Sequence, residues 1–359
     1  MKNIEWINKI NNKLMDDESK KIFASRVLYS IVGDAEYLYI LGRDFRRKVI
    51  ESEEWKNFIE TLREYEVKKG LVIYGAGAFG EKMIDMTAGV VWNCIIDRFP
   101  QLDRVRNVSV LSVEDYLKRD RKEMIVIPSK RYYEDMKSFL IENGVEESRI
   151  IDGTVLYELT EGRQYFDLEQ LPKVGEKEVF LDVGCCDGMS SVQFMKWSKG
   201  NGYCYCFEPD ESNMEKVKAN FKAKGISEND YTLIPKGAWS EKGKISFVAN
   251  GSGSSHVVGV YGENEASCIS SIEVETIDSV AQNVPVSFIK MDIEGAELKA
   301  LEGAQEVIKE RKPKLAICVY HKAEDIWEIP EYILKLRPDY SFYLRHYSFE
   351  QSETVLYAI

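Results

Sequence analysis

The sequence predicts an α/β protein in which two doubly wound, Rossmann-like domains follow a helical N-terminal segment. Short apolar stretches typical of buried strands alternate with helical stretches in two separate series. Each series opens with a strand that runs into a glycine-containing loop, at residues 71–80 and at residues 179–188. Strands that alternate with helices form parallel sheets, because a parallel pair needs a crossover connection between its strands.

Four segments follow from this pattern. Apolar side chains recur at helical spacing within residues 1–66, which we expect to form a helical cap or a dimerisation arm. Residues 67–157 form the smaller Rossmann-like domain. Residues 158–178 are rich in charge and lack a period, so they are predicted to be a linker. Residues 179–359 form the larger domain, which ends in two strands with no helix between them and therefore in an antiparallel pair.

The composition limits the classes of function. With 359 residues, 44% of them hydrophobic, the chain is long enough for two full cores. A formal net charge of -12 argues against a nucleic-acid binder, which needs a basic surface. No apolar run is long enough to span a membrane, and residues 1–6 lack the apolar core of a signal peptide. The 7 cysteines include no CxxC pair, so we expect reduced thiols and a cytoplasmic protein.

The loop at residues 182–188 gives the first indication of a ligand. Gly184 and Gly188 leave room for a ligand beside the backbone, since they have no Cβ. Asp182 ends the strand, where it could meet the ammonium group of a ligand or order the loop that does so, and Asp187 adds a second carboxylate. A pyrophosphate site presents glycines and a bare helix N-terminus to an anion. This acidic loop therefore favours a cationic ligand such as S-adenosylmethionine.

Further contacts with this cofactor are expected at the ends of the next strands. Glu208 ends the second strand of the series, and a carboxylate there can accept hydrogen bonds from both hydroxyls of a ribose. Ala238 lies near the end of the third strand, predicted at residues 231–239, and Asp292 follows the fourth, predicted at residues 286–291. Because open α/β sheets bind ligands at the carboxyl ends of their strands, we assign all three residues to the cofactor site.

Acidic and imidazole side chains are expected to meet at the ends of the fourth and fifth strands. Asp292 and Glu294 follow the fourth strand, and His321 follows the fifth, predicted at residues 315–320. A hydroxyl that accepts a methyl group must lose its proton, and we expect His321 or Asp292 to be the general base. An unperturbed histidine pKa of about 6.5 suits neutral pH. We expect no metal ion, although Asp292, Glu294 and His321 could hold a divalent cation.

Four residues are candidates for contact with the acceptor. Ser255 and His256 belong to a glycine- and serine-rich insertion that could form a lid over the site or a plain hairpin turn. Lys322 directly follows His321 at the end of the fifth strand. Arg345 lies in the terminal strand pair, where it could reach an anionic acceptor such as a phosphorylated sugar or remain solvated.

Residues 179–359 resemble the FkbM family of S-adenosylmethionine-dependent methyltransferases. The matching strings are LDVG at residues 181–184, FEP at 207–209 and KMDIEGAE at 290–297, and the last of these is the most specific. The resemblance implies the seven-stranded class I methyltransferase sheet with its terminal antiparallel pair. It also implies O-methylation, commonly of a hydroxyl on a sugar, a glycan or a secondary metabolite. The chain departs from the family at residues 185–187, CCD, where members often carry small or amide residues.

The smaller domain carries a dinucleotide-binding pattern. Gly75, Gly77 and Gly80 follow a buried strand, and Asp97 ends the next strand about 20 residues later. The domain resembles small Rossmann-like modules that precede enzymes of sugar-nucleotide and polysaccharide assembly. Three interpretations remain open: it binds a nucleotide or nucleotide-linked sugar, it binds a nicotinamide cofactor, or it serves as a packing or docking module without a ligand.

Taken together, the sequence predicts an S-adenosylmethionine-dependent O-methyltransferase that acts on a hydroxyl of a sugar, a glycan precursor or a related small molecule. One alternative is an NAD(P)- or nucleotide-sugar-binding oxidoreductase that uses the loop at residues 75–80. Another is a catalytically silent nucleotide-binding scaffold. We expect a small-molecule or glycan acceptor as partner, no nucleic acid and no membrane insertion, and a homodimer is a further expectation.

Overall fold

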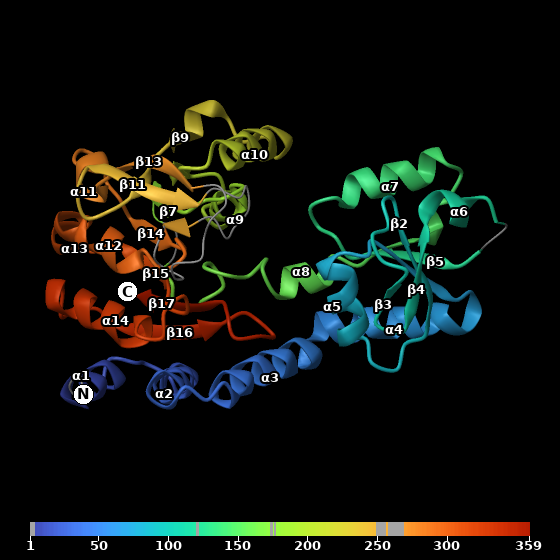
Figure 1. Cartoon of the computed structure of the whole chain (residues 1–359), viewed down its shortest axis with the longest axis horizontal. Coiled ribbons are helices and arrows are strands. Elements are labelled where there is room, and N and C mark those ends of the chain that lie inside the picture. Colours follow the sequence, from blue (N-terminus) through green and yellow to red (C-terminus); the bar gives the residue numbers. More distant parts are fainter. Residues whose placement is uncertain (1–3, 120–121, 173–174, 176, 249–255, 258–268) are drawn as a thin grey trace. The chain divides into compact units, whose positions relative to one another are not determined.

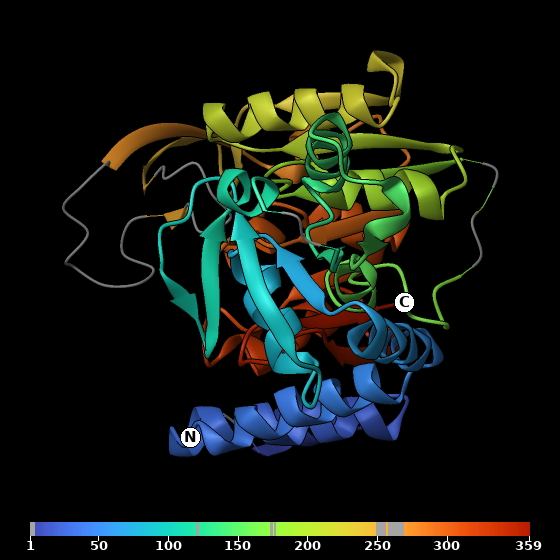
Figure 2. The ribbon, with the colours of Figure 1, turned by 90° about the vertical axis from the view of Figure 1, so that its right-hand side faces the viewer.

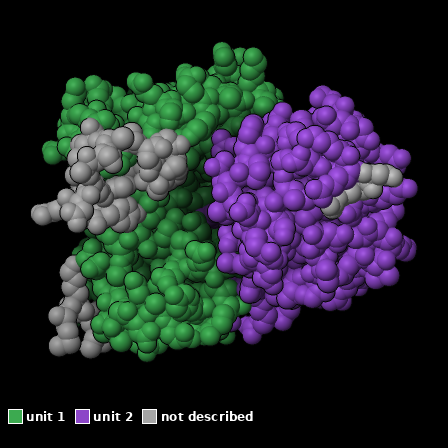
Figure 3. Space-filling model, turned by 45° about the vertical axis from the view of Figure 1, so that its right-hand side comes forward, with its two compact units in different colours: residues 1–43, 165–359 green, residues 44–164 purple. Residues whose placement is uncertain are grey.

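The structure is a computed structural model, and it divides the chain into two compact units (Figure 3). Unit 1 comprises residues 1–43 and 165–359, and unit 2 comprises residues 44–164. The boundary falls within the helix α3 (Glu36–Glu51). The residues that the structure describes are 4–119, 122–172, 175, 177–248, 256–257 and 269–359.

The main sheet of unit 1 has seven strands in the order β16-β17-β15-β14-β7-β8-β9. The pairs from β15 to β9 are parallel, and β17 lies antiparallel to both β15 and β16. The predicted α/β class and the terminal antiparallel pair are therefore confirmed. The strands are β7 (Glu178–Val183), β8 (Gly202–Phe207), β9 (Tyr231–Ile234), β14 (Phe288–Met291), β15 (Lys314–Cys318), β16 (Phe342–His346) and β17 (Thr354–Ala358).

Helices cover both faces of this sheet, and Figure 1 shows α9 and α10 on one side and α12, α13 and α14 on the other. Successive side chains of a strand point to opposite faces. Leu181 and Val183 therefore join the large apolar core, whereas Phe180 packs on the α9 side against Phe194. The helices are α9 (Met189–Trp197), α10 (Glu211–Ala223), α11 (Ile277–Val280), α12 (Glu297–Glu302), α13 (Gln305–Arg311) and α14 (Asp325–Leu336).

The first helices of the chain belong to the core of unit 1. α1 (Ile4–Asn11) packs beside α14, and α2 (Asp17–Val32) packs beside β16 (Figure 1). Ile22 and Phe23 of α2 are buried in the same apolar core as Phe342 of β16. The described part of this segment, residues 4–66, is mainly helical as predicted, and the compact units divide it, since α4 (Glu53–Lys68) belongs to unit 2.

A second, four-stranded sheet in unit 1 was not predicted. Its order is β10-β13-β11-β12, and the expected strand at residues 231–239 is divided between the two sheets. Pro235 follows β9 and has no N–H to continue a ladder, which separates β9 from β10. The strands are β10 (Gly237–Ala238), β11 (Gly243–Val248), β12 (His256–Val257) and β13 (Ile269–Glu275).

Two residues of the segment predicted to be a linker, residues 158–178, pack within unit 1. Tyr165 is buried, and Phe166 contacts the rings of Phe180, Phe194 and Phe288. The residues that make these contacts are not spaced as in a helix or a strand, because the segment after α8 (Val155–Leu159) is irregular. Their role in packing could therefore not be predicted from periodicity.

Unit 2 contains a six-stranded sheet in the order β3-β4-β2-β1-β5-β6, with every pair parallel except β3 with β4 (Figure 2). Its parallel strands follow the Rossmann order. The strands are β1 (Leu71–Tyr74), β2 (Trp92–Asp97), β3 (Arg104–Val105), β4 (Val108–Ser112), β5 (Met124–Ile127) and β6 (Ile150–Asp152). The helices besides α4 and α8 are α5 (Ala78–Met86), α6 (Val113–Leu117) and α7 (Tyr133–Glu142). Across the described parts of both units, no helix combines the length and apolar character needed to cross a membrane.

Candidate functional site

A pocket opens in unit 1 at the carboxyl ends of β7, β8, β10 and β14. Four of the predicted cofactor residues line it, namely Gly184, Glu208, Ala238 and Asp292. The second sheet adds an apolar wall that includes Ile245, Phe247 and Ile272. The pocket therefore lies where ligands bind in open α/β sheets.

The two glycines of the loop after β7 are needed for packing within the protein. A Cβ on Gly184 would lie 2.1 Å from the backbone oxygen of Asp292, and Gly184 has a φ of +78°. A Cβ on Gly188 would lie 2.7 Å from the ring of Phe221 on α10, and its φ is +81°. Both glycines are thus required by packing, and Gly184 also lines the pocket, so the expectation that they leave room for a ligand stays a prediction.

Asp182 orders the loop, which is the second of its two predicted roles. Its carboxylate accepts hydrogen bonds from the hydroxyls of Ser190 at 2.6 Å and Ser191 at 2.7 Å. Lys290 lies opposite Asp182 on β14, with Nζ 3.3 Å from the carboxylate, and it donates to the backbone oxygen of Gly184 at 2.6 Å. Asp182 is fully buried, so no surface of it meets the pocket.

Asp187 does not line the pocket, so its predicted contact with the cofactor is not supported. Its carboxylate accepts a hydrogen bond from the backbone of Met189 at 3.2 Å, at the start of α9. The neighbouring Cys186 lines the pocket instead, with a φ of +51° that turns its N–H toward Glu208. A left-handed backbone at a residue with a Cβ is uncommon, and no sequence pattern predicted it at Cys186.

Glu208 is held as expected of a ligand-binding carboxylate. Its two oxygens accept hydrogen bonds from the backbone N–H groups of Cys186 and Asp210, each at 2.9 Å. The side chain lines the pocket although the residue is only 5% exposed. Burial raises the pKa of Glu208 to about 7, against the lowering effect of these hydrogen bonds and one from Asn213.

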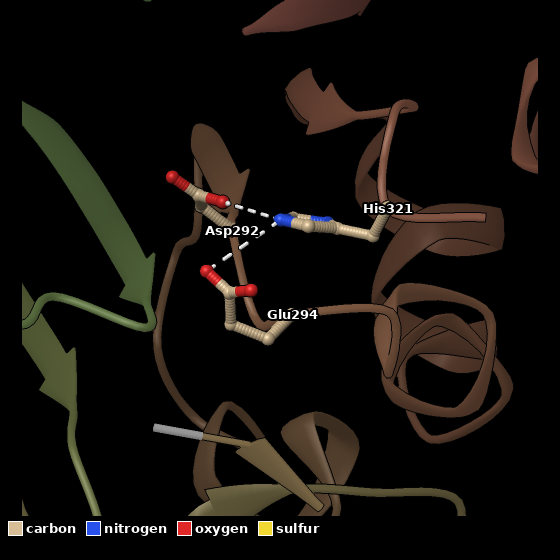
Figure 4. A group of neighbouring side chains, drawn as sticks. All are labelled: Asp292, Glu294 and His321. Atoms are coloured by element: carbon tan, nitrogen blue, oxygen red, sulfur yellow. Dashed lines mark ion pairs between the residues drawn. The ribbon is translucent and has the colours of Figure 1, made fainter. Parts of the chain in front are cut away.

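Asp292, Glu294 and His321 meet at one end of the pocket and are called here the acid–histidine cluster (Figure 4). His321 Nε2 lies 3.4 Å from an oxygen of Asp292 and 3.7 Å from an oxygen of Glu294. Figure 4 shows both carboxylates directed at this one ring nitrogen. On the other edge of the ring, Nδ1 lies 3.0 Å from Glu297, the first residue of α12.

Two tyrosines that the sequence reasoning missed hold the carboxylate of Asp292. The hydroxyl of Tyr165 donates to it at 2.9 Å and the hydroxyl of Tyr320 at 3.3 Å. Tyr320 directly precedes His321, so its position could have been noticed in the sequence. Tyr165 lies 127 residues from Asp292 in a segment without a period, and no sequence signal links the two.

Comparison with known proteins assigns the part of the chain that contains the pocket to a family. Residues 182–349 match the family model described as the methyltransferase FkbM domain, and this range contains Glu208 and the whole acid–histidine cluster. Residues 182–349 are an FkbM methyltransferase domain. The predicted resemblance is confirmed, and the chain is a methyltransferase. No protein of curated function matches the sequence.

Several solved structures are similar to the chain. Methyltransferase FkbM from Methylobacillus flagellatus KT is 20% identical, with 91% of this chain and 100% of that chain covered and a TM-score of 0.47. Fibrillarin from Aeropyrum pernix, solved with natively bound S-adenosyl-L-methionine, is 9% identical over 54% of this chain and 71% of that chain, with a TM-score of 0.35. A SAM-dependent methyltransferase from Aquifex aeolicus is 16% identical over 58% and 98%, with a TM-score of 0.32.

The charges of the FkbM domain bear on the predicted general base. Burial disfavours the imidazolium form of His321, but the carboxylates of Glu294, Glu297 and Asp292 outweigh it and raise the pKa of His321 to about 11. Burial likewise raises the pKa of Asp292, but Lys290 and His321 outweigh this and leave the pKa of Asp292 below its usual value. A histidine with a pKa this far above neutral carries a proton at neutral pH, so His321 would have to lose that proton before it could act as the base, and this role stays a prediction.

The predicted acceptor residues lie apart from one another in the FkbM domain. Lys322 donates to the backbone oxygen of Gly295. Arg345 forms an ion pair with Asp16 of the N-cap of α2 at 2.7 Å, so it is neither solvated nor directed at the pocket. Ser255 lies outside the described residues, and of His256 only its place in β12 is described.

In unit 2, the predicted nucleotide loop has the expected backbone. Gly75 has a φ of +115°, Gly77 is the N-cap of α5, and a Cβ on Gly80 would lie 2.0 Å from the backbone oxygen of Gly75. The carboxylate of Asp97 accepts hydrogen bonds from the backbone of Ala76 at 2.7 Å and of Phe99 at 2.9 Å. Asp97 thus ties the loop to β2.

Proposed function

We propose that the FkbM domain transfers the methyl group of S-adenosylmethionine to a hydroxyl of a sugar, a glycan precursor or a related small molecule. The observation that carries the proposal is a single pocket that has a carboxylate suited to a ribose, Glu208, and at another strand end the acid–histidine cluster. The first feature would bind the nucleoside, and the second would face the transferred methyl group and the acceptor.

Several contacts support this placement of the donor. Glu208 is fixed by two backbone N–H groups, so each oxygen keeps a lone pair for the ribose diol. Gly184 and Asp292 line the pocket, and the carboxylate of Asp292 could attract the cationic sulfonium end. The apolar side chains of the second sheet would exclude water from the reacting atoms.

The chemistry required of the protein is mainly alignment. The acceptor oxygen attacks the methyl carbon in line with the sulfur, the S–C bond breaks as the O–C bond forms, and the sulfonium charge disappears. Holding the reacting atoms about 3–3.5 Å apart supplies much of the rate. Asp292, itself fixed by Tyr165 and Tyr320, is placed to accept a hydrogen bond from the hydroxyl and to orient it, and its carboxylate takes the hydroxyl proton as the O–C bond forms.

Isothermal titration calorimetry with S-adenosylhomocysteine, NAD and a UDP-sugar tests the donor site. We expect one S-adenosylhomocysteine per chain, with the affinity lowered roughly tenfold or more in Glu208→Ala, because two charge-assisted hydrogen bonds are lost. Glu310→Gln, an exposed change on α13, is the control and keeps full affinity. Binding of NAD alone would overturn the proposal and favour the oxidoreductase alternative.

For unit 2 the three interpretations of the loop at residues 75–80 stay open. Asp97 accepts two backbone hydrogen bonds that hold the loop, one at each oxygen, and like Glu208 it keeps lone pairs for a ribose, so this geometry does not separate a nucleotide site from a packing or docking role. The same calorimetry separates the alternatives. If the chain binds NAD or a UDP-sugar in addition to S-adenosylhomocysteine, and Asp97→Asn abolishes only this second binding, then the loop at residues 75–80 binds a ligand.

We further propose a cytoplasmic protein, in keeping with the free thiols of the described cysteines.

A further inference from the structure

We propose that Asp292, Glu294 and His321 bind a divalent metal ion at the acceptor end of the pocket. One donor atom from each residue lies within 4.8 Å of the other two. Asp292 and Glu294 also line the pocket, so an ion held here would be open to a ligand. Binding of the ion does not depend on the proposed function, but its role in methyl transfer rests on it.

The imidazole of His321 distinguishes this cluster from a group of surface acids. Its side chain is only 3% exposed, and the polar contacts of Nε2 are the ion-pair approaches of Asp292 at 3.4 Å and Glu294 at 3.7 Å, neither of which has the geometry of a hydrogen bond. Buried polar atoms without a hydrogen-bond partner are rare, and each calls for an explanation such as a missing ion. This nitrogen is directed at the space between the two carboxylates (Figure 4).

The spacing of the donor atoms suits a small divalent ion. Ligands at about 2.0–2.2 Å from a tetrahedral metal lie about 3.3–3.6 Å from one another. The separations from Nε2 to the carboxylate oxygens are 3.4 Å for Asp292 and 3.7 Å for Glu294. A metal at this point would need only small movements of the side chains.

Outer contacts support the same site. Metal-binding histidines commonly direct their second ring nitrogen at a carboxylate, and His321 Nδ1 lies 3.0 Å from the fully buried Glu297. Glu297 is itself fixed, since it accepts a hydrogen bond from the backbone of Ile293 at 2.9 Å. Asp292 is oriented by the hydroxyls of Tyr165 and Tyr320.

The donor set indicates the kind of ion and what it would supply. Imidazole suits zinc and similar transition metals, and carboxylates suit manganese and magnesium, so a mixed set favours Mn²⁺ or Zn²⁺. Three protein ligands leave a coordination position open, as in catalytic metal sites. A bound ion would lower the pKa of an acceptor hydroxyl that enters this position.

Direct titration with MnCl₂ tests the site without reference to activity. The full chain is freed of metal with a chelator, and free Mn²⁺ is then measured by electron paramagnetic resonance. We expect one tightly bound Mn²⁺ per chain, with the affinity lowered roughly tenfold or more in His321→Ala and in Glu294→Gln. Glu297→Gln should cost about 10- to 100-fold, as expected for a residue that orients a ligand, and the exposed Glu310→Gln should cost nothing.

S-adenosylhomocysteine binding is measured on the same samples to separate this proposal from the proposed function. Binding of S-adenosylhomocysteine also reports whether each variant folds. If His321→Ala does not fold, Glu294→Gln is used to test the metal site. Wild-type protein that binds S-adenosylhomocysteine but no stoichiometric Mn²⁺ overturns the metal site alone, as does Mn²⁺ binding that survives in folded His321→Ala or Glu294→Gln. Protein that binds Mn²⁺ but no S-adenosylhomocysteine overturns the proposed function and leaves the metal site standing.

Discussion

Glu208 is buried between two backbone N–H groups, and this environment determines when its carboxylate is charged. Because burial raises its pKa to about 7, the neutral form predominates below that pH in the ligand-free protein. The surrounding groups are Cys186, Asp210, Asn213 and, across the pocket, Lys236. Only the ionised carboxylate can accept hydrogen bonds from both hydroxyls of a ribose.

We therefore predict that the affinity for S-adenosylhomocysteine falls as the pH is lowered through 7. The affinity falls, and does not rise, because the ligand binds the ionised form of Glu208, which becomes scarcer below its raised pKa. Each pH unit below 7 therefore lowers the affinity by up to about tenfold. Calorimetry between pH 8 and pH 6 measures this change, with Glu208→Gln as the control that shows weak binding at both values. An affinity of the wild type that stays constant over this range would contradict the assignment.

Tyr165 positions Asp292 and should therefore affect turnover more than cofactor binding. Tyr165→Phe removes a 2.9 Å hydrogen bond to this carboxylate, and hydrogen bonds to charged groups contribute about 1.5–3 kcal/mol. We expect kcat to fall roughly tenfold or more, while the affinity for S-adenosylhomocysteine changes less than about twofold. Tyr132→Phe, at an exposed tyrosine of unit 2, is the control. Unchanged kcat, or equal losses in kcat and affinity, would contradict a positioning role.

At this scale the sequence predicted Gly184, Glu208, Ala238 and Asp292 as pocket residues because each follows or ends a strand of an alternating series. It could not predict Tyr165, since only the folded chain brings an irregular segment beside β14. The predicted cofactor contact of Asp187 stays a prediction, since its carboxylate accepts a hydrogen bond from the start of α9 and does not line the pocket. Strand periodicity shows where a strand ends, but not which way a loop side chain points.

At the scale of elements, the loop after β7 and the loop after β14 depend on each other. Gly184 permits the contact, because a Cβ there would lie 2.1 Å from the backbone oxygen of Asp292. The two loops also share Lys290, which binds both Asp182 and the backbone of Gly184. The cofactor loop and the acid–histidine cluster are thereby fixed as one body.

Gly184→Ala should consequently destabilise unit 1 by more than the strain of an alanine at a positive φ, because its Cβ would also collide with the backbone of Asp292. Gly200→Ala is a matched control, since Gly200 has the same φ of +78° and a Cβ there would meet nothing within 4 Å. We expect the control to lower the free energy of unfolding by about 1–2 kcal/mol and Gly184→Ala to lower it by about 3 kcal/mol or more. Urea denaturation measures both, and equal effects would show that the close contact does not matter.

The five parallel strands of the main sheet could be predicted because they are buried and regularly separated by helices. The second sheet could not, since β10 and β12 have two residues each and no period can be seen in so short a strand. β13 lies antiparallel to β11 and parallel to β10, and such pairing depends on contacts distant in sequence. This sheet nevertheless supplies the apolar wall of the pocket.

At the scale of the whole molecule, the N-terminal helices are part of the catalytic unit. α2 packs against β16, and Arg345 of that strand forms an ion pair with Asp16, the N-cap residue of α2. The sequence predicted the helices but left open whether they cap a domain or serve as a dimerisation arm. Burial of Ile22 and Phe23 in the core of unit 1 supports the cap, and a homodimer remains a prediction.

Asp16→Ala should accordingly weaken unit 1 although it lies far from the pocket in sequence. The change removes a helix cap, since Asp16 accepts a hydrogen bond from the backbone of Ser19 at 2.8 Å, together with the ion pair to Arg345. We expect a loss of about 1–2 kcal/mol in the free energy of unfolding. Asp17→Ala, at a fully exposed neighbour, should change it by less than about 0.5 kcal/mol. Equal losses in the two variants would argue against this attachment.

Methyl transfer is the activity on which the proposed roles of Glu208 and Asp292 depend, and transfer of a radiolabelled methyl group from S-adenosylmethionine measures it most directly. Purified wild-type protein and Asp292→Asn are incubated with a fraction of small hydroxylated metabolites and sugar phosphates from a cell extract. We expect label in an alkali-stable ether product with the wild type, reduced by about 10²-fold or more with Asp292→Asn. Protein that binds S-adenosylhomocysteine yet labels no acceptor would instead identify a silent nucleotide-binding scaffold.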